Sequence, residues 1–192
     1  FVAIAVVVAG ASKGEGLGNQ LLANIRETDA IVNVVRCFAD DNIVHVAGKV
    51  DPISDIETIS TELALADLAS VEKAIIREGK KAKSGDKDAQ KLVAIMERLQ
   101  AHLDQGLPVR SAGLDEDELL IIKPLCLLTV KPAMYVANVA EDGFANNPFL
   151  DALPELASKE GAPVVAVCAA MEAEIADLDD ADKTEFLQEM GL

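Results

Sequence analysis

Four short, largely apolar segments separated by helical patterns constrain the fold of this chain more than any other feature. They are residues 1–8, 30–38, 132–139 and 163–167. Strands that are apolar along most of their length are typical of a parallel sheet covered on both faces. Residues 17–27 and 147–160 show helical spacing, and Gly161 is placed to end the second helix. The sequence therefore predicts an α/β fold with a mainly parallel sheet and flanking helices.

A long helical stretch interrupts this alternation. From residue 53 to residue 105, apolar side chains recur every three or four positions, and Ser84-Gly85-Asp86 breaks the stretch. Either Ser84 or Asp86 is suited to cap the second helix. A short acidic helix is expected at 115–122. We therefore expect an antiparallel helical hairpin inserted into the α/β domain, with divisions at 1–52, 53–120 and 121–192.

The charge of the chain limits its partners. Its 192 residues carry 33 acidic and 17 basic side chains, a formal net charge of −16. A chain this acidic repels phosphate backbones and anionic lipid surfaces. We therefore expect no direct nucleic-acid binding and no membrane binding. Aromatic residues are 3% of the chain, which leaves few side chains for stacking on bases.

The first eleven residues are too few to span a bilayer, and no basic segment or Met precedes them, so we interpret them as a buried strand.

The cysteines are odd in number and far apart, which fits neither a disulfide framework nor a zinc site and favours a cytoplasmic location. The histidines are isolated, so no metal site is expected. These residues are Cys37, Cys126, Cys168, His45 and His102.

A glycine-rich loop follows the first predicted strand and precedes a helix. Gly10, Gly14, Gly16 and Gly18 allow close backbone approach, so the loop could offer N–H groups to an anion. The sequence is neither GxxxxGK[ST] nor a GxGxxG with a ribose-binding acid at the usual distance. A flexible turn before a helix is the alternative interpretation.

Two further motifs follow predicted strands. Asn138-Val-Ala-Glu141 ends the third strand, where open α/β sheets bind ligands, and an asparagine amide can both donate to and accept from a base edge. Cys168-Ala-Ala170 follows the fourth, and its small side chains let backbone amides approach a ligand. The alternatives are a turn for the first motif and tight packing for the second. Cys168 as a nucleophile lacks a nearby base.

The order of these elements resembles the later half of a GTPase-like G domain, and long strings resemble one family, the YchF/Obg-like ATPases. This family is a branch of the Obg-related, translation-factor class of P-loop NTPases. The resemblance covers essentially all 192 residues. Its strings are residues 1–38, DIETISTELALADL at 55–68, ANVAEDGFANNPFLD at 137–151, PVVAVCAAMEAEIADL at 163–178 and DKTEFLQEMGL at 182–192.

The resemblance implies a cytoplasmic, ribosome-associated protein that binds and hydrolyses ATP with Mg²⁺, with GTP less favoured. It implies that Asn138 contacts the base edge, that Val139 packs on the ring, and that Glu141 stands where related GTPases have the Asp that reads guanine. Cys168, Ala169 and Ala170 border the base through backbone groups. The loop from Gly10 to Gly18 corresponds to switch II, which responds to the γ-phosphate.

Two departures from the family pattern put catalysis by this chain in doubt. Ala3 and Val6 occupy the positions of the Asp and Gly of the switch II DxxG motif, so Ala3 cannot take part in metal binding. The resemblance places the P-loop and switch I before Phe1 and a TGS domain after Leu192. We therefore expect no catalytic or metal-binding residue in this chain, no tightly bound cofactor and no efficient ATP hydrolysis. The alternative is a non-enzymatic interaction module that works through the helical hairpin.

Overall fold

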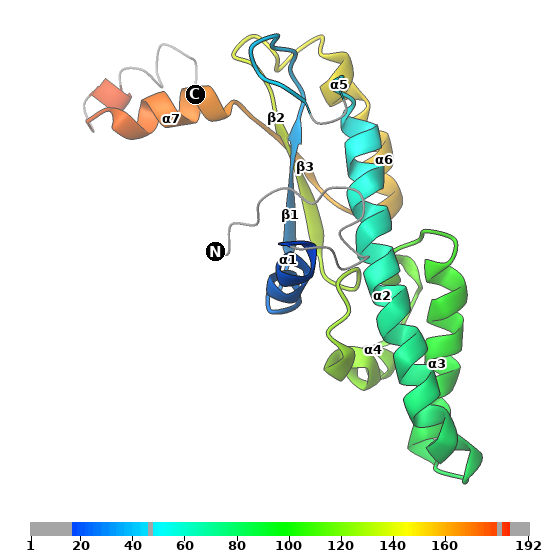
Figure 1. The fold of residues 1–192 in the computed structure, drawn as a ribbon. Coiled ribbons are helices and arrows are strands. Elements are labelled where there is room, and N and C mark those ends of the chain that lie inside the picture. Colours follow the sequence, from blue (N-terminus) through cyan, green and yellow to red (C-terminus); the bar gives the residue numbers. More distant parts are fainter. Residues whose placement is uncertain (1–16, 46–47, 180–181, 185–192) are drawn as a thin grey trace. The chain divides into compact units, whose positions relative to one another are not determined.

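Three parallel strands form a sheet in the part of the chain that the structure describes. The computed structural model describes residues 17–45, 48–179 and 182–184. The strands β1 (Ile31–Arg36), β2 (Ala133–Asn138) and β3 (Val164–Val167) lie in the order β1-β2-β3 (Figure 1). Tyr135 pairs with Val164 and Asn138 with Val167 in parallel register. The prediction of an α/β fold with a parallel sheet is confirmed for the described strands; predicted strand 1–8 lies outside the described residues.

The chain folds as two compact units. Unit 1 takes in the described residues of Phe1–Ile31 together with Ser54–Ala133, and unit 2 takes in those of Val32–Ile53 and Met134–Leu192. Unit 2 therefore holds most of the sheet, and unit 1 holds the hairpin. The three-segment division of the sequence remains a prediction.

The helical hairpin of unit 1 forms as expected. Helix α2 (Pro52–Lys83) and helix α3 (Lys87–Leu103) are joined at Ser84-Gly85-Asp86. Asp86 is the N-cap, because its carboxylate accepts hydrogen bonds from the backbone N–H groups of Asp88 and Ala89, both at 3.0 Å. Gly85 has a φ of +96°, a conformation that few residues other than glycine adopt in such a tight turn. The sequence thus fixes the reversal of the chain locally.

Apolar side chains cover two faces of α2. One cluster of buried residues packs α2 against α3 and the segment after it: Ala64, Val71, Ala74, Ile95, Met96, Leu99, Leu103, Val109, Ile122 and Leu127. A second cluster joins α2 to helix α1 (Leu17–Arg26) and to Leu128, and its other members are Leu22, Ile25, Leu63 and Ala66. Because both faces of the middle of α2 are covered, this helix is the centre of unit 1.

Short elements complete both units. The 3-10 turn η2 (Val109–Ser111), helix α4 (Glu116–Ile122) and the 3-10 turn η3 (Lys123–Leu125) follow α3. Asp115 and Glu118 form a capping box at the start of α4. In unit 2, α5 (Pro148–Asp151) and α6 (Leu153–Glu160) lie between β2 and β3, and α7 (Ala169–Asp177) follows β3. Gly161 ends α6 at a φ of +66°, as predicted.

A buried carboxylate ties the hairpin to the segment that leads into β2. Asp67 of α2 is fully buried. It accepts hydrogen bonds from the backbone N–H groups of Leu128 and Thr129, both at 2.7 Å, and from the Thr129 hydroxyl at 2.8 Å. Arg26 of α1 lies 3.9 Å from the same carboxylate. Burial raises the pKa of Asp67, and these hydrogen bonds and Arg26 act against that rise.

We expect Asp67→Ala to lower the free energy of unfolding by about 3–5 kcal/mol, because it leaves three buried donors without an acceptor. Urea unfolding followed by circular dichroism measures this loss. Glu72→Ala is the matched control, since it removes an exposed carboxylate from the same helix; its effect should stay within about 0.5 kcal/mol. A loss for Asp67→Ala no larger than that of the control would refute the role assigned to Asp67.

The ion pair between α3 and α4 should make a pH-dependent contribution to the stability of the folded chain. Arg98 Nη2 lies 2.8 Å from Glu118 Oε2. This bond, with help from the backbone N–H of Asp115, lowers the pKa of Glu118 below its ordinary value of 4.5. Because the folded state holds the ionised form, the stabilisation is present above pH 4.5 and is lost as the pH falls below it.

Thermal melts at several pH values test this. Glu118→Gln should melt at a lower temperature than the unmodified chain at neutral pH, and the gap should close as the pH falls below the ordinary pKa of glutamate. Glu97→Gln, on the exposed side of α3, serves as the control and should not show this gap. A gap that persists unchanged in acid would show that the ion pair is not its source.

Candidate functional site: the carboxyl ends of the parallel strands

The carboxyl ends of the three strands meet at one edge of the sheet in unit 2. The backbone N–H of Cys37, just after β1, donates to the carbonyl of Asn138 at 2.8 Å. The backbone N–H of Val139, just after β2, donates to the carbonyl of Val167 at 2.9 Å. The segments that follow the strands therefore start side by side. In open α/β sheets, this edge is where ligands bind.

Asn138 joins two of these segments. Its side-chain Oδ1 accepts a hydrogen bond from the backbone N–H of Ala169 at 3.0 Å, across 31 residues of sequence. The bond connects the end of β2 to the first turn of α7. Within the described part of the chain, the Nδ2 group of Asn138 makes no hydrogen bond, so its two N–H donors remain available to a ligand.

The segment after β3 offers small side chains at this edge. Cys168 is the N-cap of α7 and is buried, whereas the side chains of Ala169 and Ala170 are exposed. Backbone groups in the first turn of α7 are thus not covered by long side chains. The backbone N–H of Ala169 is already bonded to Asn138, and a contact of these three residues with a ligand through their backbone stays a prediction.

The structure separates the remaining residues of the Asn138–Glu141 motif. Glu141 is exposed. The side chain of Val139, in contrast, is only 2% exposed and packs inside the unit. It does not present a surface on which a base could stack in this conformation. Of the six residues predicted to surround a base, Asn138 and Ala169 are directly bonded, Val139 and Cys168 are buried, and Glu141 and Ala170 face solvent.

Asn147 holds the loop that carries the motif, a role that the sequence does not predict. This residue is buried, and its Nδ2 donates to the carbonyls of Cys37 and Gly143, each at 2.9 Å. Its Oδ1 accepts from the backbone N–H of Phe149 at 3.1 Å, at the start of α5. The sequence signal is only Asn before Pro148, which is typical of a helix start. The bond to Cys37 spans 110 residues and leaves no local trace.

Gly143 allows the loop to close. A Cβ atom at this position would lie 3.0 Å from the backbone N and O of Ala140 and 3.1 Å from the Cβ of Val139. The backbone N–H of Gly143 donates to the Ala140 carbonyl at 2.9 Å, which forms the turn after β2. The motif residues are thus shaped by a turn that only glycine fits without displacement.

Several predicted residues cannot be placed at this site. Gly10, Gly14, Gly16, Ala3 and Val6 lie outside the described residues, and Gly18 lies in α1, where its surroundings are not described. The predicted switch II loop therefore remains a prediction.

Other side-chain chemistry at the sheet edge is limited. Among the described residues, no three His, Cys, Asp or Glu side chains are grouped so that they could hold a metal ion. Burial raises the pKa of Cys37 to about 11, so its thiol stays neutral near neutral pH.

Away from the sheet edge, His102 has a structural role: its Nε2 lies 3.1 Å from the Pro108 carbonyl and 3.0 Å from the Ser111 hydroxyl. Of the helices that the structure describes, none combines the length and the apolarity needed to cross a membrane.

Comparisons with known proteins give close relatives over the whole chain. No family model matches it. Proteins called ribosome-binding ATPase YchF match all of this chain and 53% of their own length, with 62% identity in Haemophilus influenzae, 59% in Escherichia coli O157:H7 and 50% in Bacillus subtilis. The structure of the Schizosaccharomyces pombe YchF GTPase matches with a TM-score of 0.80 and 30% identity, over 93% of this chain and 50% of that one. The chain spans about half the length of the curated relatives it matches.

The turn at Gly143 can be tested directly. Gly143→Ala should lower the free energy of unfolding by about 1–3 kcal/mol, because backbone atoms must move to admit the methyl group. It should also shift the amide NMR signals of Asn138 and Ala169. Gly79→Ala, within α2 and with nothing within 4 Å of the added Cβ, is the matched control and should stabilise the chain by up to about 1 kcal/mol. Equal effects of the two substitutions would contradict the close approach at Gly143.

Proposed function

Because this chain belongs to the YchF family and spans about half the length of its relatives, we propose that it forms the base-recognition part of a ribosome-associated ATPase. The residues assigned to this role are Asn138, Glu141, Ala169 and Ala170, with Val139 and Cys168 as buried support beneath them. The assignment covers the base of the nucleotide only. Ribosome association, and with it a cytoplasmic location, is proposed from the names of the relatives.

The hydrogen bond between Asn138 and Ala169 carries this proposal. With Oδ1 held by the Ala169 N–H at 3.0 Å, the amide plane has a fixed orientation and its Nδ2 donors are left for a ligand. An oriented donor discriminates among base edges, because a base without an acceptor at that place leaves the donor unpaired. A side chain that turned freely would give no such discrimination.

We assign a preference for adenine over guanine to the same edge. In related GTPases an Asp at the position of Glu141 pairs with two N–H groups of guanine. The longer glutamate side chain is less suited to that paired contact, and Glu141 is exposed with no hydrogen bond among the described residues that would hold it in place. ATP is therefore the proposed nucleotide, and GTP the weaker one.

The proposal does not assign binding of the nucleotide's phosphates to these residues. The 192 residues contain no GxxxxGK[ST] sequence, and their described part has no cluster of metal-binding side chains. Mg²⁺ therefore belongs to the proposal only as the partner of ATP in the family, and no step of hydrolysis is assigned to a residue of this chain.

The alternative function, an interaction module, has one specific observation in its favour. The hairpin of α2 and α3 has its own buried core in unit 1, whereas the sheet edge lies in unit 2. The residues assigned to the two functions thus belong to different units.

Two substitutions at Asn138 test base recognition. Titration with adenosine and with guanosine, followed by NMR, should show the stronger response to adenosine at the amides of residues 138–143 and 168–170. Asn138→Ala should weaken adenosine binding by about three- to tenfold, the value of one hydrogen bond. Asn138→Asp keeps an acceptor for the Ala169 N–H but removes the Nδ2 donors, so it should weaken binding to a similar extent.

The matched control is Asn24→Ala, which removes an exposed asparagine from α1. It should leave adenosine binding unchanged. Adenosine binding by Asn138→Asp equal to that of the unmodified chain would refute a role for the amide donors. Turnover of ATP by these 192 residues alone would contradict the restriction of the proposal to the base.

A further inference from the structure

The end of the helical hairpin has a charge opposite to that of the rest of the chain. We define the hairpin tip as residues 77–91, which contain six basic and three acidic side chains and thus a local charge of +3. Since the net charge of the chain is −16, the other residues carry −19. The net charge alone predicts no affinity for phosphate backbones, but it does not describe this end of the molecule.

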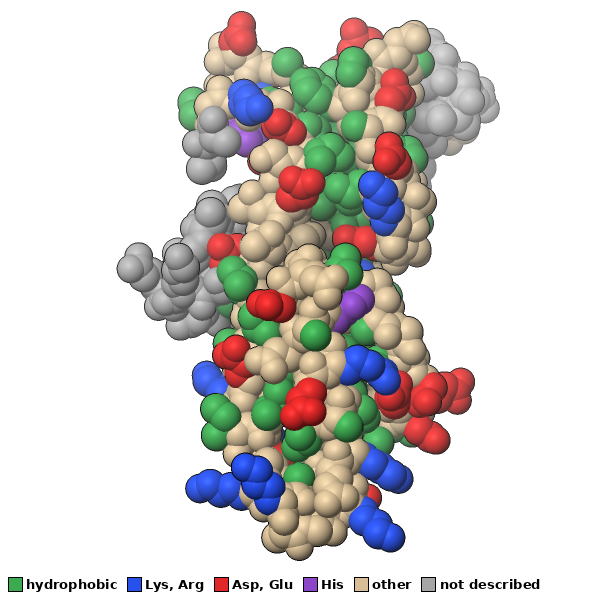
Figure 2. Space-filling model, turned by 90° about the vertical axis from the view of Figure 1, so that its right-hand side faces the viewer, with side chains coloured by type: hydrophobic (Ala, Val, Ile, Leu, Met, Phe, Trp, Pro, Cys, Tyr) green, Lys and Arg blue, Asp and Glu red, His purple; other side chains and the backbone are tan. Residues whose placement is uncertain are grey.

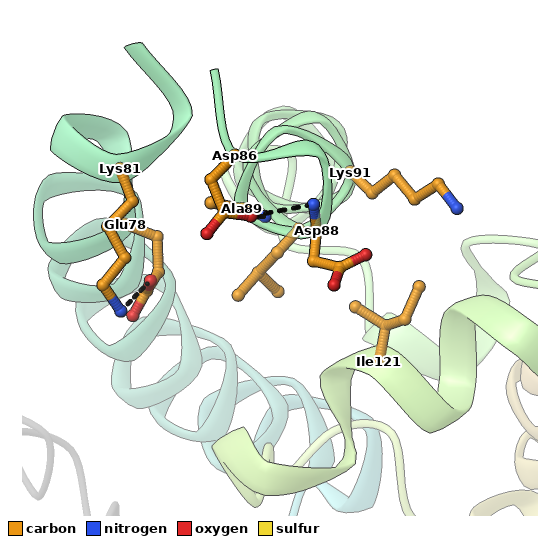
Figure 3. Close-up of a pocket in the computed structure, with 8 residues that line it drawn as sticks. Glu78, Lys81, Asp86, Asp88, Ala89, Lys91 and Ile121 are labelled. Carbon is orange, nitrogen blue, oxygen red and sulfur yellow. Dashed lines mark hydrogen bonds and ion pairs between the residues drawn. The ribbon is translucent and has the colours of Figure 1, made fainter. Parts of the chain in front are cut away.

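Two of the three acidic groups of the hairpin tip, those of Glu78 and Asp86, are already engaged within it. Glu78 bonds to Arg77 and Lys81, each at 2.8 Å, and the Asp86 carboxylate caps α3. Glu78, Asp86 and Asp88 line a hollow of about 400 Å³ between α2, α3 and Ile121 of α4 (Figure 3). Lys81 and Lys91 line the same hollow, and the three acids are too few to cancel the six basic side chains of the tip.

Four lysines of the hairpin tip remain free. Lys80, Lys83, Lys87 and Lys91 are exposed, and within the described residues none of them forms an ion pair. Lys91 extends away from Glu78 and Lys81 in Figure 3. Lys and Arg side chains project around the lower end of the molecule in Figure 2, which is the end where α2 and α3 meet in Figure 1. Lys80, Lys83 and Lys87 lie close to the turn in sequence, and Lys91 lies at the edge of the hollow.

Helix stability does not account for all of these lysines. Lys80 and Lys83 lie in the last turns of α2, where a cation interacts favourably with the helix dipole. Lys87, however, is the first residue of α3, where the dipole disfavours a positive charge. Helix stability therefore does not explain the lysine at position 87.

We propose that the hairpin tip is a docking surface for the phosphate backbone of structured RNA. Lysine carries a compact point charge that suits phosphate, whereas the planar guanidinium of arginine is better matched to a protein carboxylate. The single arginine of the tip is already bonded to Glu78. Residues 77–91 contain no aromatic side chain and no apolar one larger than alanine. Stacking on bases and insertion into a membrane therefore have no side chains to use.

The acidic remainder of the chain does not prevent this contact. From Asp67 to Lys83 the helix α2 extends for about 24 Å at 1.5 Å per residue. The Debye length at physiological ionic strength is about 8 Å, so distant exposed charges are largely screened at the hairpin tip. The end of the hairpin makes the contact, which depends on the charge and shape of the RNA and not on its base sequence. RNA is chosen as the phosphate backbone because of the proposed association with the ribosome, and this part of the inference rests on that proposal.

Fluorescence anisotropy with a labelled RNA hairpin of about 16 base pairs, the length that a compact double-strand-binding module spans, tests the proposal. The triple variant Lys80→Gln/Lys83→Gln/Lys87→Gln should bind at least about tenfold more weakly at low salt. The slope of log affinity against log salt should fall by about one for each lysine removed.

The matched control removes the same charge from exposed lysines elsewhere, as Lys49→Gln/Lys123→Gln/Lys159→Gln. It should keep most of the affinity and the slope. The proposal is overturned if both triple variants lose affinity equally, if the hairpin-tip variant binds like the unmodified chain, or if the unmodified chain does not bind the RNA. Competition by poly-glutamate or by phosphatidylserine vesicles at the same charge concentration would likewise reject RNA as the partner.

Cosedimentation with bacterial ribosomes separates this inference from the proposed function. If the hairpin-tip variant sediments with ribosomes as the unmodified chain does, the hairpin-tip surface is rejected while ribosome association stands. If neither sediments but the RNA hairpin still binds through the tip, ribosome association is rejected and the hairpin-tip surface stands. Loss of cosedimentation in the hairpin-tip variant alone supports both.

Discussion

The middle of α2 is bonded to the segment before β2 through one fully buried carboxylate, that of Asp67. Its three hydrogen bonds fix the segment at Leu128 and Thr129 against the middle of α2. Thr129 in turn accepts a hydrogen bond from the backbone N–H of Val109, which follows α3. One carboxylate therefore links, directly or through Thr129, the middle of α2, the segment after α3 and the segment before β2. Burying a carboxylate in this way is tolerated because both of its oxygens accept hydrogen bonds.

The candidate site depends on a different kind of constraint, the parallel register of the strands. Because β1, β2 and β3 run in the same direction, the segments after Arg36, Asn138 and Val167 begin at one edge. The Asn138–Ala169 bond then fixes an amide at that edge, and Asn147 fixes the loop that follows. The geometry suits recognition of a flat base by oriented donors, and among the described residues no cluster of His, Cys, Asp or Glu could hold a metal ion.

Much of the secondary structure could be predicted because its signals are local. The Asp86 cap, the Asp115 capping box and the left-handed Gly161 all act within four residues of the position where they occur. The β-branched residues of the strands are similarly local. The positions of Asn138 and Ala169 at one edge also followed from the sequence, since parallel strands place their carboxyl ends together.

The tertiary structure decided what those local signals could not. Nothing near Asp67 in sequence distinguishes it from a solvated charge on α2, because its partners are 61 and 62 residues away. The burial of Val139 depends on packing around the loop, so the sequence predicted a base-stacking side chain that the structure encloses. Net charge is likewise a sum over the chain; the lysines of residues 77–91 are neighbours in sequence, but only the structure shows that four of them are exposed and form no ion pair among the described residues. The sequence by itself determined the elements and their order, because propensity and capping act over a few residues; the tertiary structure decided burial and pairing, because these depend on residues far apart in the chain.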